Sequence, residues 1–261
     1  MMERGTAESA TAGSEHRHLT VVRTPPINLP TPLTPLIARE REAATLVEWI
    51  CQENERLVTL TGPGGVGKTR LALQVAREVA KEFGDGVYFV GLAAVISPAL
   101  VLPAIAQTFG MAEPGGDSTT TRLRSFLRTR RLLLVLDNFE HVVDAAPEVA
   151  ALLSDCHHLS ILVTSRALLS IRGERAFAVQ SLDMPPQGVV WDEPTAAVRL
   201  FMDRARAVRF DIPDDADTTQ AVAEICRRLD GLPLAIELAA ARANVLRPRD
   251  LLARLAGRCR S

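Results

Sequence analysis

The fold is decided by Leu57-Val-Thr-Leu-Thr-Gly62-Pro-Gly64-Gly65-Val-Gly67-Lys68-Thr69-Arg70, in which an apolar, β-branched run meets four glycines and then a helical pattern. This order predicts a strand, a glycine-rich loop and a helix, and residues 62–69 fit the phosphate-loop pattern G-x-x-x-x-G-K-[ST]. Glycines let successive backbone N–H groups turn toward a phosphate, and the helix N-terminus adds further amide donors. Lys68 then brings a positive charge to the β- and γ-phosphates, and Thr69 offers a hydroxyl to Mg²⁺.

The same glycines also fit the dinucleotide-binding pattern G-x-G-x-x-G of a Rossmann domain. A Rossmann site needs an acidic side chain at the end of the next strand, where it holds the ribose. Here the next strand, expected at 87–90, runs into Gly91, and the nearest acid, Asp85, precedes it. Neither a Rossmann turn nor a plain glycine cap of a helix calls for Lys68 and Thr69 in this register, so the sequence favours the phosphate loop.

The overall composition is that of a globular protein. The 261 residues suit one domain of ordinary size and a smaller one, and 47% hydrophobic with 4% aromatic residues predict an aliphatic core. A net charge of -1 gives no general attraction to nucleic acid or to an anionic membrane. We find no apolar run of membrane-spanning length and no apolar signal core, so we expect a cytoplasmic protein. The cysteines lack metal-ligand spacing and are expected as free thiols: Cys51, Cys156, Cys226 and Cys259.

Apolar runs alternate with amphipathic stretches over the first two thirds of the chain, which predicts a doubly wound α/β domain with a parallel sheet. The expected strands are 57–61, 87–90, 131–136, 159–163 and 176–180. A helix is expected to open at Leu36 and to end near Cys51. We divide the chain into a disordered, Pro-rich arm at 1–30, a phosphate-loop nucleotide-binding domain at 31–182, a linker at 183–194 and a small all-α domain at 195–261.

Polar side chains follow two other buried strands, and ligands in parallel sheets gather at such strand ends. Asp137 suits the acid that holds Mg²⁺, through a water, although an aspartate in this place can also cap a helix. Arg166 suits a sensor of the γ-phosphate, with a surface salt bridge as the alternative. The expected contacts with nucleotide from the loop and the strand ends are Gly62, Pro63, Gly64, Gly65, Val66, Gly67, Lys68, Thr69, Arg70, Asp137 and Asn138, with Thr69 and Asp137 as metal ligands.

The catalytic base is the weakest part of the pattern. Many ATP-hydrolysing relatives carry a glutamate directly after the metal-holding aspartate, whereas this chain carries Asn138 there. Glu140 is the remaining candidate to orient water, and its alternative is a carboxylate at a helix start. We therefore expect ATP hydrolysis to be slow or absent.

Four motifs in order resemble the NB-ARC module of the signal-transduction ATPases with numerous domains (STAND), which are P-loop NTPases of the ASCE type. They are the phosphate loop, the strand 132–137, Thr164-Ser165-Arg166 and Gly231-Leu-Pro-Leu-Ala235. The segments 136–141 and 28–34 look closest to bacterial regulators of the LuxR and antibiotic-regulator types. The resemblance covers about residues 28 to 256.

The resemblance implies a switch with ATP/ADP and Mg²⁺ as cofactors, in which ADP holds a closed form and ATP favours self-association. It implies that residues 36–42 seat adenine, with Ala38 in place of a glycine and Arg39 in contact with the nucleotide. Pro233 would press on adenine or ribose from the helical domain. We see no DNA-binding motif in the sequence up to Ser261 and none of the family's downstream domains, so we expect a truncated or stand-alone module with unknown protein partners.

Two functions are compatible with these motifs. The first is a nucleotide-dependent signalling switch with little turnover, which Asn138 after Asp137 and the motif at 231–235 favour. The second is a cycling ATPase or a phosphotransferase that uses the same phosphate loop.

Overall fold

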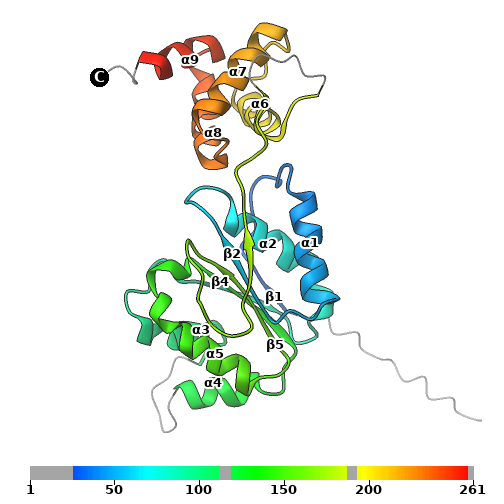
Figure 1. Ribbon diagram of the computed structural model, residues 1–261, viewed down its shortest axis with the longest axis vertical. Coiled ribbons are helices and arrows are strands. Elements are labelled where there is room, and N and C mark those ends of the chain that lie inside the picture. The colour runs from blue at the N-terminus through cyan, green and yellow to red at the C-terminus, as the bar shows by residue number, and fades with distance from the viewer. Residues whose placement is uncertain (1–25, 112–118, 187–192, 258–261) are drawn as a thin grey trace, which may run out of the picture.

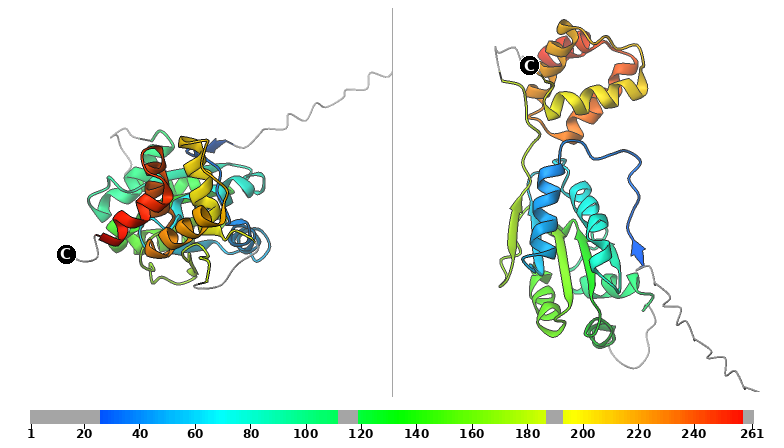
Figure 2. Two further views of the ribbon diagram at one scale, coloured as in Figure 1. Left: turned by 90° about the horizontal axis from the view of Figure 1, so that it is seen from above. Right: turned by 90° about the vertical axis from the view of Figure 1, so that its right-hand side faces the viewer.

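The computed structural model describes residues 26–111, 119–186 and 193–257. They form an α/β domain with a small bundle of helices stacked on one end of it (Figure 1). The bundle lies above the carboxyl ends of the strands, and the chain that leaves the last strand runs up into it (Figure 2). This arrangement confirms the predicted order of a doubly wound α/β domain followed by an all-α part.

The sheet has six strands in the order β1-β3-β4-β5-β2-β6, and every neighbouring pair is parallel. The strand β2 that precedes the phosphate loop is separated from β4 by β5, which is the ASCE arrangement that we expected. All residues of β4 and β5 are buried, which explains their continuous apolar runs. The strands are β1 (Ile27–Asn28), β2 (Leu57–Thr61), β3 (Val87–Gly91), β4 (Leu132–Asp137), β5 (Leu159–Thr164) and β6 (Arg175–Ala178).

Helices cover both faces of the sheet, each with its own apolar cluster. On one face lie α1 (Glu40–Cys51) and α2 (Lys68–Glu78), and on the other lie α3 (Val101–Thr108), α4 (Thr119–Leu127) and α5 (Ala146–Asp155). Short 3₁₀ helices occupy Ala80–Glu82, Pro98–Leu100, Phe139–His141, Val143–Ala145 and Ala241–Asn244.

The bundle consists of α6 (Ala196–Val208), α7 (Ala216–Arg228), α8 (Pro233–Ala240) and α9 (Pro248–Gly257). Their apolar faces enclose a separate cluster around Phe201, Ile225 and Ile236. The helix α7 begins where the Asp215 carboxylate accepts a hydrogen bond from the Thr218 N–H at 2.7 Å, a side-chain cap that satisfies a helix-start donor. The bundle therefore has its own apolar core and, at α7, a helix start that is fixed by a local side-chain cap.

The predicted start of the first helix at Leu36 is wrong, because α1 begins at Glu40. Ala38 has a φ of 56° and Arg39 has a φ of −129°, so neither residue continues a right-handed helix. Ala38 thus adopts the left-handed backbone that suits the glycine of the related motif, although it carries a Cβ.

The arm before α1 lies along the α/β domain. Its first described residues include the edge strand β1, which pairs with Val87 and Tyr88 and which the sequence analysis did not expect. Arg77 on α2 donates a hydrogen bond to the Pro30 carbonyl further along the arm. The disorder predicted for the start of the arm and part of the predicted linker lie outside the described residues, at 1–25 and 187–192.

Two sequence-level expectations concern the chain as a whole. Within the described residues, Cys51, Cys156 and Cys226 are free thiols, as expected. None of the described helices combines the length and the apolar character that a membrane crossing needs.

The connection between the two parts depends on Gly231, which has a φ of 62°. A Cβ at this position would lie 2.5 Å from the Leu182 carbonyl oxygen, and the Leu182 N–H donates to the Gly231 carbonyl at 3.0 Å. We expect Gly231→Ala to lower the free energy of unfolding by at least about 1 kcal/mol, because an alanine is strained at this φ and clashes with backbone. Urea denaturation followed by circular dichroism measures the loss.

Gly84→Ala is the matched control, because a Cβ at Gly84 meets nothing within 4 Å. We expect the control to change the free energy of unfolding by less than about 0.5 kcal/mol. Equal stabilities of the two variants would contradict the structural role of Gly231.

Candidate functional site

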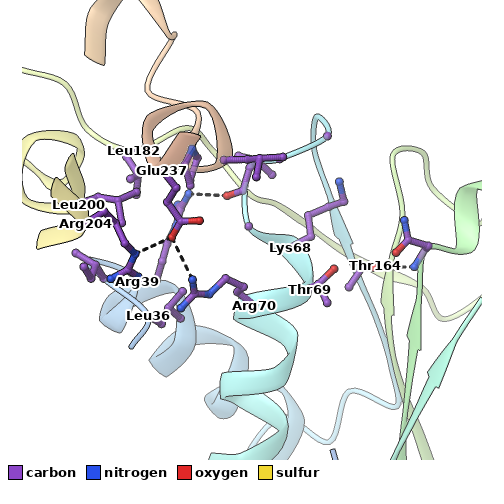
Figure 3. A pocket seen from close by; sticks show the side chains of 18 of the residues that line it. Leu36, Arg39, Lys68, Thr69, Arg70, Thr164, Leu182, Leu200, Arg204 and Glu237 are labelled. Atoms are coloured by element: carbon purple, nitrogen blue, oxygen red, sulfur yellow. Dashed lines mark hydrogen bonds and ion pairs between the residues drawn. The ribbon is translucent and has the colours of Figure 1, made fainter. Parts of the chain in front are cut away.

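A cavity of about 420 Å³ lies where the carboxyl ends of β2, β4 and β5 meet the helical bundle. Figure 3 shows side chains from both parts around it, with Lys68 and Thr69 on one side and Arg204 and Glu237 on the other. A cavity of this size is within the range of small-molecule sites. Its lining comprises Pro35, Leu36, Ile37, Arg39, residues 64–70, Asn138, Glu140, Thr164, Arg166, Leu182, Leu200, Arg204, Pro233, Leu234 and Glu237.

The glycine-rich loop leads into α2 through Gly67, whose φ of 99° is left-handed. The Lys68 Nζ folds back over the loop and donates hydrogen bonds to the carbonyls of Gly62 at 2.8 Å and Pro63 at 3.0 Å. Burial lowers the pKa of the Lys68 amine, an effect that the nearby Glu140 carboxylate opposes. A bound anion at the loop would favour the charged amine in the same way.

Asp137 lies at the end of β4 with only 7% of its surface exposed. Its Oδ1 accepts hydrogen bonds from the hydroxyls of Thr69 and Thr164, both at 2.6 Å. The Thr164 hydroxyl in turn accepts the Asn138 N–H at 3.0 Å. Mg²⁺ prefers oxygen ligands and is commonly held by one carboxylate together with substrate phosphates, so the oxygens of Thr69 and Asp137 fit the metal that the sequence predicts.

Arg166 and Glu140 face the loop from the ends of β5 and β4. The Arg166 Nε lies 3.3 Å from the Glu140 Oε1, with the arginine 65% and the glutamate 12% exposed. A Cβ built on Gly64 would lie 3.6 Å from the Arg166 Nη2, which places the guanidinium beside the loop. The salt bridge that we weighed against the sensor role therefore exists, but it lies within the cavity lining. The Glu140 Oε2 is buried and has no hydrogen-bond partner among the described residues.

Arg39 lines the cavity from the arm, but its guanidinium mainly contacts protein. It donates to the carbonyls of Val66 at 3.2 Å and Gln180 at 2.6 Å, and it pairs with Glu42. The side chain is 5% exposed, so these contacts occupy a buried site. Arg39 thus ties the phosphate loop to the chain that follows β6.

The helical bundle supplies the other wall. Pro233 is the first residue of α8, and the Leu234 N–H donates to the Gly65 carbonyl at 3.1 Å. Sequence reasoning missed Leu182, Leu200, Arg204 and Glu237. The helical period offers a signal for Glu237 alone, because it follows Pro233 by four residues and therefore shares its face of α8.

Most residues predicted for the site line this one cavity. They are Arg39, Gly64, Gly65, Val66, Gly67, Lys68, Thr69, Arg70, Asn138, Glu140, Arg166 and Pro233. Gly62, Pro63 and Asp137 do not line the cavity. They contact residues that do: the Gly62 and Pro63 carbonyls accept from Lys68, and Asp137 accepts from Thr69 and Thr164.

A family model described as "AAA domain" matches residues 51–172, which contain the phosphate loop and the strands that carry Asp137 and Arg166. This part of the chain is a P-loop NTPase module of the AAA type, and it is similar to modules of regulatory proteins. In this NTPase module the phosphate loop, Asp137 and Arg166 follow or end β2, β4 and β5, in the geometry described above.

Three curated relatives are bacterial. An uncharacterized protein of Mycobacterium tuberculosis is 42% identical over 87% of this chain and 56% of its own length. A second protein of M. tuberculosis, named provisionally as an HTH-type transcriptional regulator, is 46% identical over 75% of this chain and 21% of its own length. The regulatory protein AfsR of Streptomyces coelicolor is 33% identical over 70% of this chain and 17% of its own length. The chain thus spans between about half and a sixth of the length of these relatives.

The NTPase resembles solved structures in its fold. The crystal structure of Cdc6p from Pyrobaculum aerophilum matches with a TM-score of 0.54 and 15% identity, over 82% of this chain and 63% of that one. At this identity the likeness concerns the fold alone.

The contacts of Arg39 predict a role in stability. We expect Arg39→Ala to lower the free energy of unfolding of the nucleotide-free protein by about 2 to 4 kcal/mol, because it leaves buried carbonyls and a carboxylate without their donor. Arg41→Ala, at an exposed position in the first turn of α1, should change it by less than about 0.5 kcal/mol. If Arg39 acted only on the nucleotide, the variant without nucleotide would be as stable as the wild type in urea denaturation.

Proposed function

We propose that this NTPase is an NB-ARC-type switch that binds ATP or ADP with Mg²⁺ and hydrolyses ATP slowly or not at all. The observation that carries the proposal is a cavity with a phosphate loop on one wall and a helical lid on the other, joined by the hydrogen bond from Leu234 to Gly65. A nucleotide bound between two domains can change their arrangement, because it shifts the equilibrium toward the open or closed form that it binds more tightly. ATP and ADP can therefore favour different arrangements.

The loop residues account for the binding of the phosphates. The loop amides and the Lys68 amine would bind the phosphate oxygens, and the Thr69 hydroxyl and the Asp137 carboxylate would hold Mg²⁺. The metal supplies neutralisation of the phosphate charge when it is bound. Arg166 extends toward the loop beside Gly64, which suits contact with a terminal phosphate.

The base end of the nucleotide fits the apolar part of the cavity. Leu36, Ile37, Leu182, Leu200 and Pro233 line this part, and they come from the arm, from the chain after β6, from α6 and from α8. An adenine ring in this place would contact both domains at once. Pro233 then acts as the contact from the helical domain that the family resemblance implies.

Slow turnover follows from the state of the candidate base. Asn138 cannot accept a proton from water, and the Glu140 carboxylate is held by Arg166.

We further propose that adenine nucleotide is the small-molecule partner of this module, and that the ATP-bound form associates with further copies of itself.

Removal of the phosphate-loop amine tests binding. We expect Mg-ADP at 100 times its dissociation constant to raise the free energy of unfolding of the wild type by about 2.7 kcal/mol. Lys68→Ala should lose most of this gain, because the charge that meets the β-phosphate is gone. Thermal denaturation with and without nucleotide measures both effects, and a wild type that is unaffected by ADP and ATP would refute the proposal.

The second candidate is an actively cycling ATPase or a phosphotransferase. It is favoured by the Glu140 Oε2, a buried carboxylate oxygen that has no hydrogen-bond partner among the described residues and belongs to a residue that lines the cavity. We expect a single-turnover assay with labelled ATP to give a rate well below ~1 per second, an ordinary rate for enzymes. A rate at or above this value that Glu140→Gln abolishes would support the enzyme and refute the switch with little turnover.

A further inference from the structure

One carboxylate on the helical bundle lies between two arginines from different parts of the molecule. The Glu237 Oε1 on α8 is 3.3 Å from the Arg70 Nη1 on α2 and 3.0 Å from the Arg204 Nε on α6. Figure 3 shows both interactions as dashed lines that converge on Glu237. Arg70 belongs to the α/β domain, so this ion pair crosses from one domain to the other.

Both arginines also hold the arm. The Arg70 Nη2 donates to the carbonyls of Thr34 at 2.7 Å and Pro35 at 2.8 Å, and the Arg204 Nη2 donates to the same Pro35 carbonyl at 3.2 Å. The arm therefore passes through the junction of α2, α6 and α8. We call Arg70, Arg204 and Glu237 the interdomain clamp.

The clamp lies next to the backbone contact between the lid and the loop. Arg70 directly follows Thr69 in α2, and Glu237 lies three residues after Leu234 in α8. The Leu234 N–H belongs to the first turn of its helix, where amides have no partner within the helix. Its hydrogen bond to the Gly65 carbonyl therefore exists only while α8 stays against the loop.

The two arginines depend on Glu237 to different degrees. Arg204 also pairs with Asp203 on its own helix. For Arg70, Glu237 is the one carboxylate within ion-pair distance among the residues that the structure describes. Without the carboxylate, two guanidinium groups would face each other around Pro35, and like charges at such a junction repel.

We propose that Glu237 is a positioning residue that holds the helical lid closed on the phosphate loop through Arg70 and Arg204, and thereby slows the release of bound nucleotide. The inference rests on the proposed function, since it concerns the same cavity. Glu237 acts through the placement of Leu234 and Pro233. Its side chain couples α2, the helix that follows the phosphate loop, to α8 of the lid.

The charge of the clamp makes closure sensitive to salt. The side chains of Arg70 and Glu237 are 30% and 29% exposed, so mobile ions reach them. Because the Debye length falls from about 10 Å at 0.1 M to about 3 Å at 1 M salt, the attraction weakens across this range. A lid held only by apolar packing would close at least as well in high salt.

Amide hydrogen exchange of the ADP-loaded protein tests the clamp at its point of action. In Glu237→Gln we expect the Leu234 amide to exchange at least about tenfold faster and the dissociation constant of ADP to rise about fivefold. The Ile236 amide donates to the Leu232 carbonyl within the bundle, so its exchange should not change. Glu224→Gln is the matched control, because Glu224 pairs with Arg227 and Arg228 inside α7.

Salt supplies an independent readout. In the wild type, exchange of the Leu234 amide should accelerate between 0.1 M and 1 M potassium chloride, and in Glu237→Gln this dependence should be lost. If Glu237→Gln accelerates the exchange of the Leu234 and Ile236 amides alike, the bundle itself has loosened. Arg70→Gln then tests the clamp alone, because Arg70 lies outside the bundle, and we expect it to accelerate Leu234 exchange without changing Ile236 exchange.

The outcomes separate the clamp from the nucleotide proposal. Unchanged Leu234 exchange in both Glu237→Gln and Arg70→Gln would overturn the clamp, whatever the protein binds. A wild type that binds no ADP would refute the proposed function, while Leu234 exchange in the unliganded protein would still test the clamp.

Discussion

Parallel pairing of β2, β4 and β5 is the constraint on which the site depends. The register sets Leu60 opposite Thr164 and Leu136 opposite Val163, so the three strands end at one edge of the sheet. Because these strands end together, the phosphate loop after β2, Asp137 at the end of β4 and Arg166 after β5 converge. The hydrogen bonds of Asp137 with Thr69 and Thr164 are the direct result.

The helical bundle turns this edge into an enclosed site. Gly231 permits the turn that docks the chain after β6 onto the bundle, and α8 then begins at Pro233 against the loop. The close approach needs a small residue on the loop as well, since a Cβ at Gly65 would lie 3.0 Å from the Leu234 Cβ. The absence of a side chain at Gly65 thus lets Leu234 come close enough for its N–H to donate to the Gly65 carbonyl.

Two observations support the proposed regulatory switch over a fast enzyme. Polar side chains are present where phosphate and metal would bind, whereas the residue that follows Asp137 is an asparagine and cannot serve as the catalytic base. Two of the relatives are named as regulators, one of them provisionally, and this chain spans 21% and 17% of their lengths. A nucleotide-dependent change between two domains is a physical means by which such a module can influence the rest of a larger protein.

Local sequence determined the loop, the buried strands and the residues at their ends, because glycine spacing, apolar runs and side-chain type act over a few residues. Tertiary structure alone decided the start of α1 at Glu40, the pairing of β1 and the clamp of Glu237 with Arg70. The partners Arg70 and Glu237 are 167 residues apart and Arg39 and Gln180 are 141 apart, so no local pattern records these contacts. They arise only when the parallel sheet and the bundle bring distant segments together, and that geometry belongs to the fold.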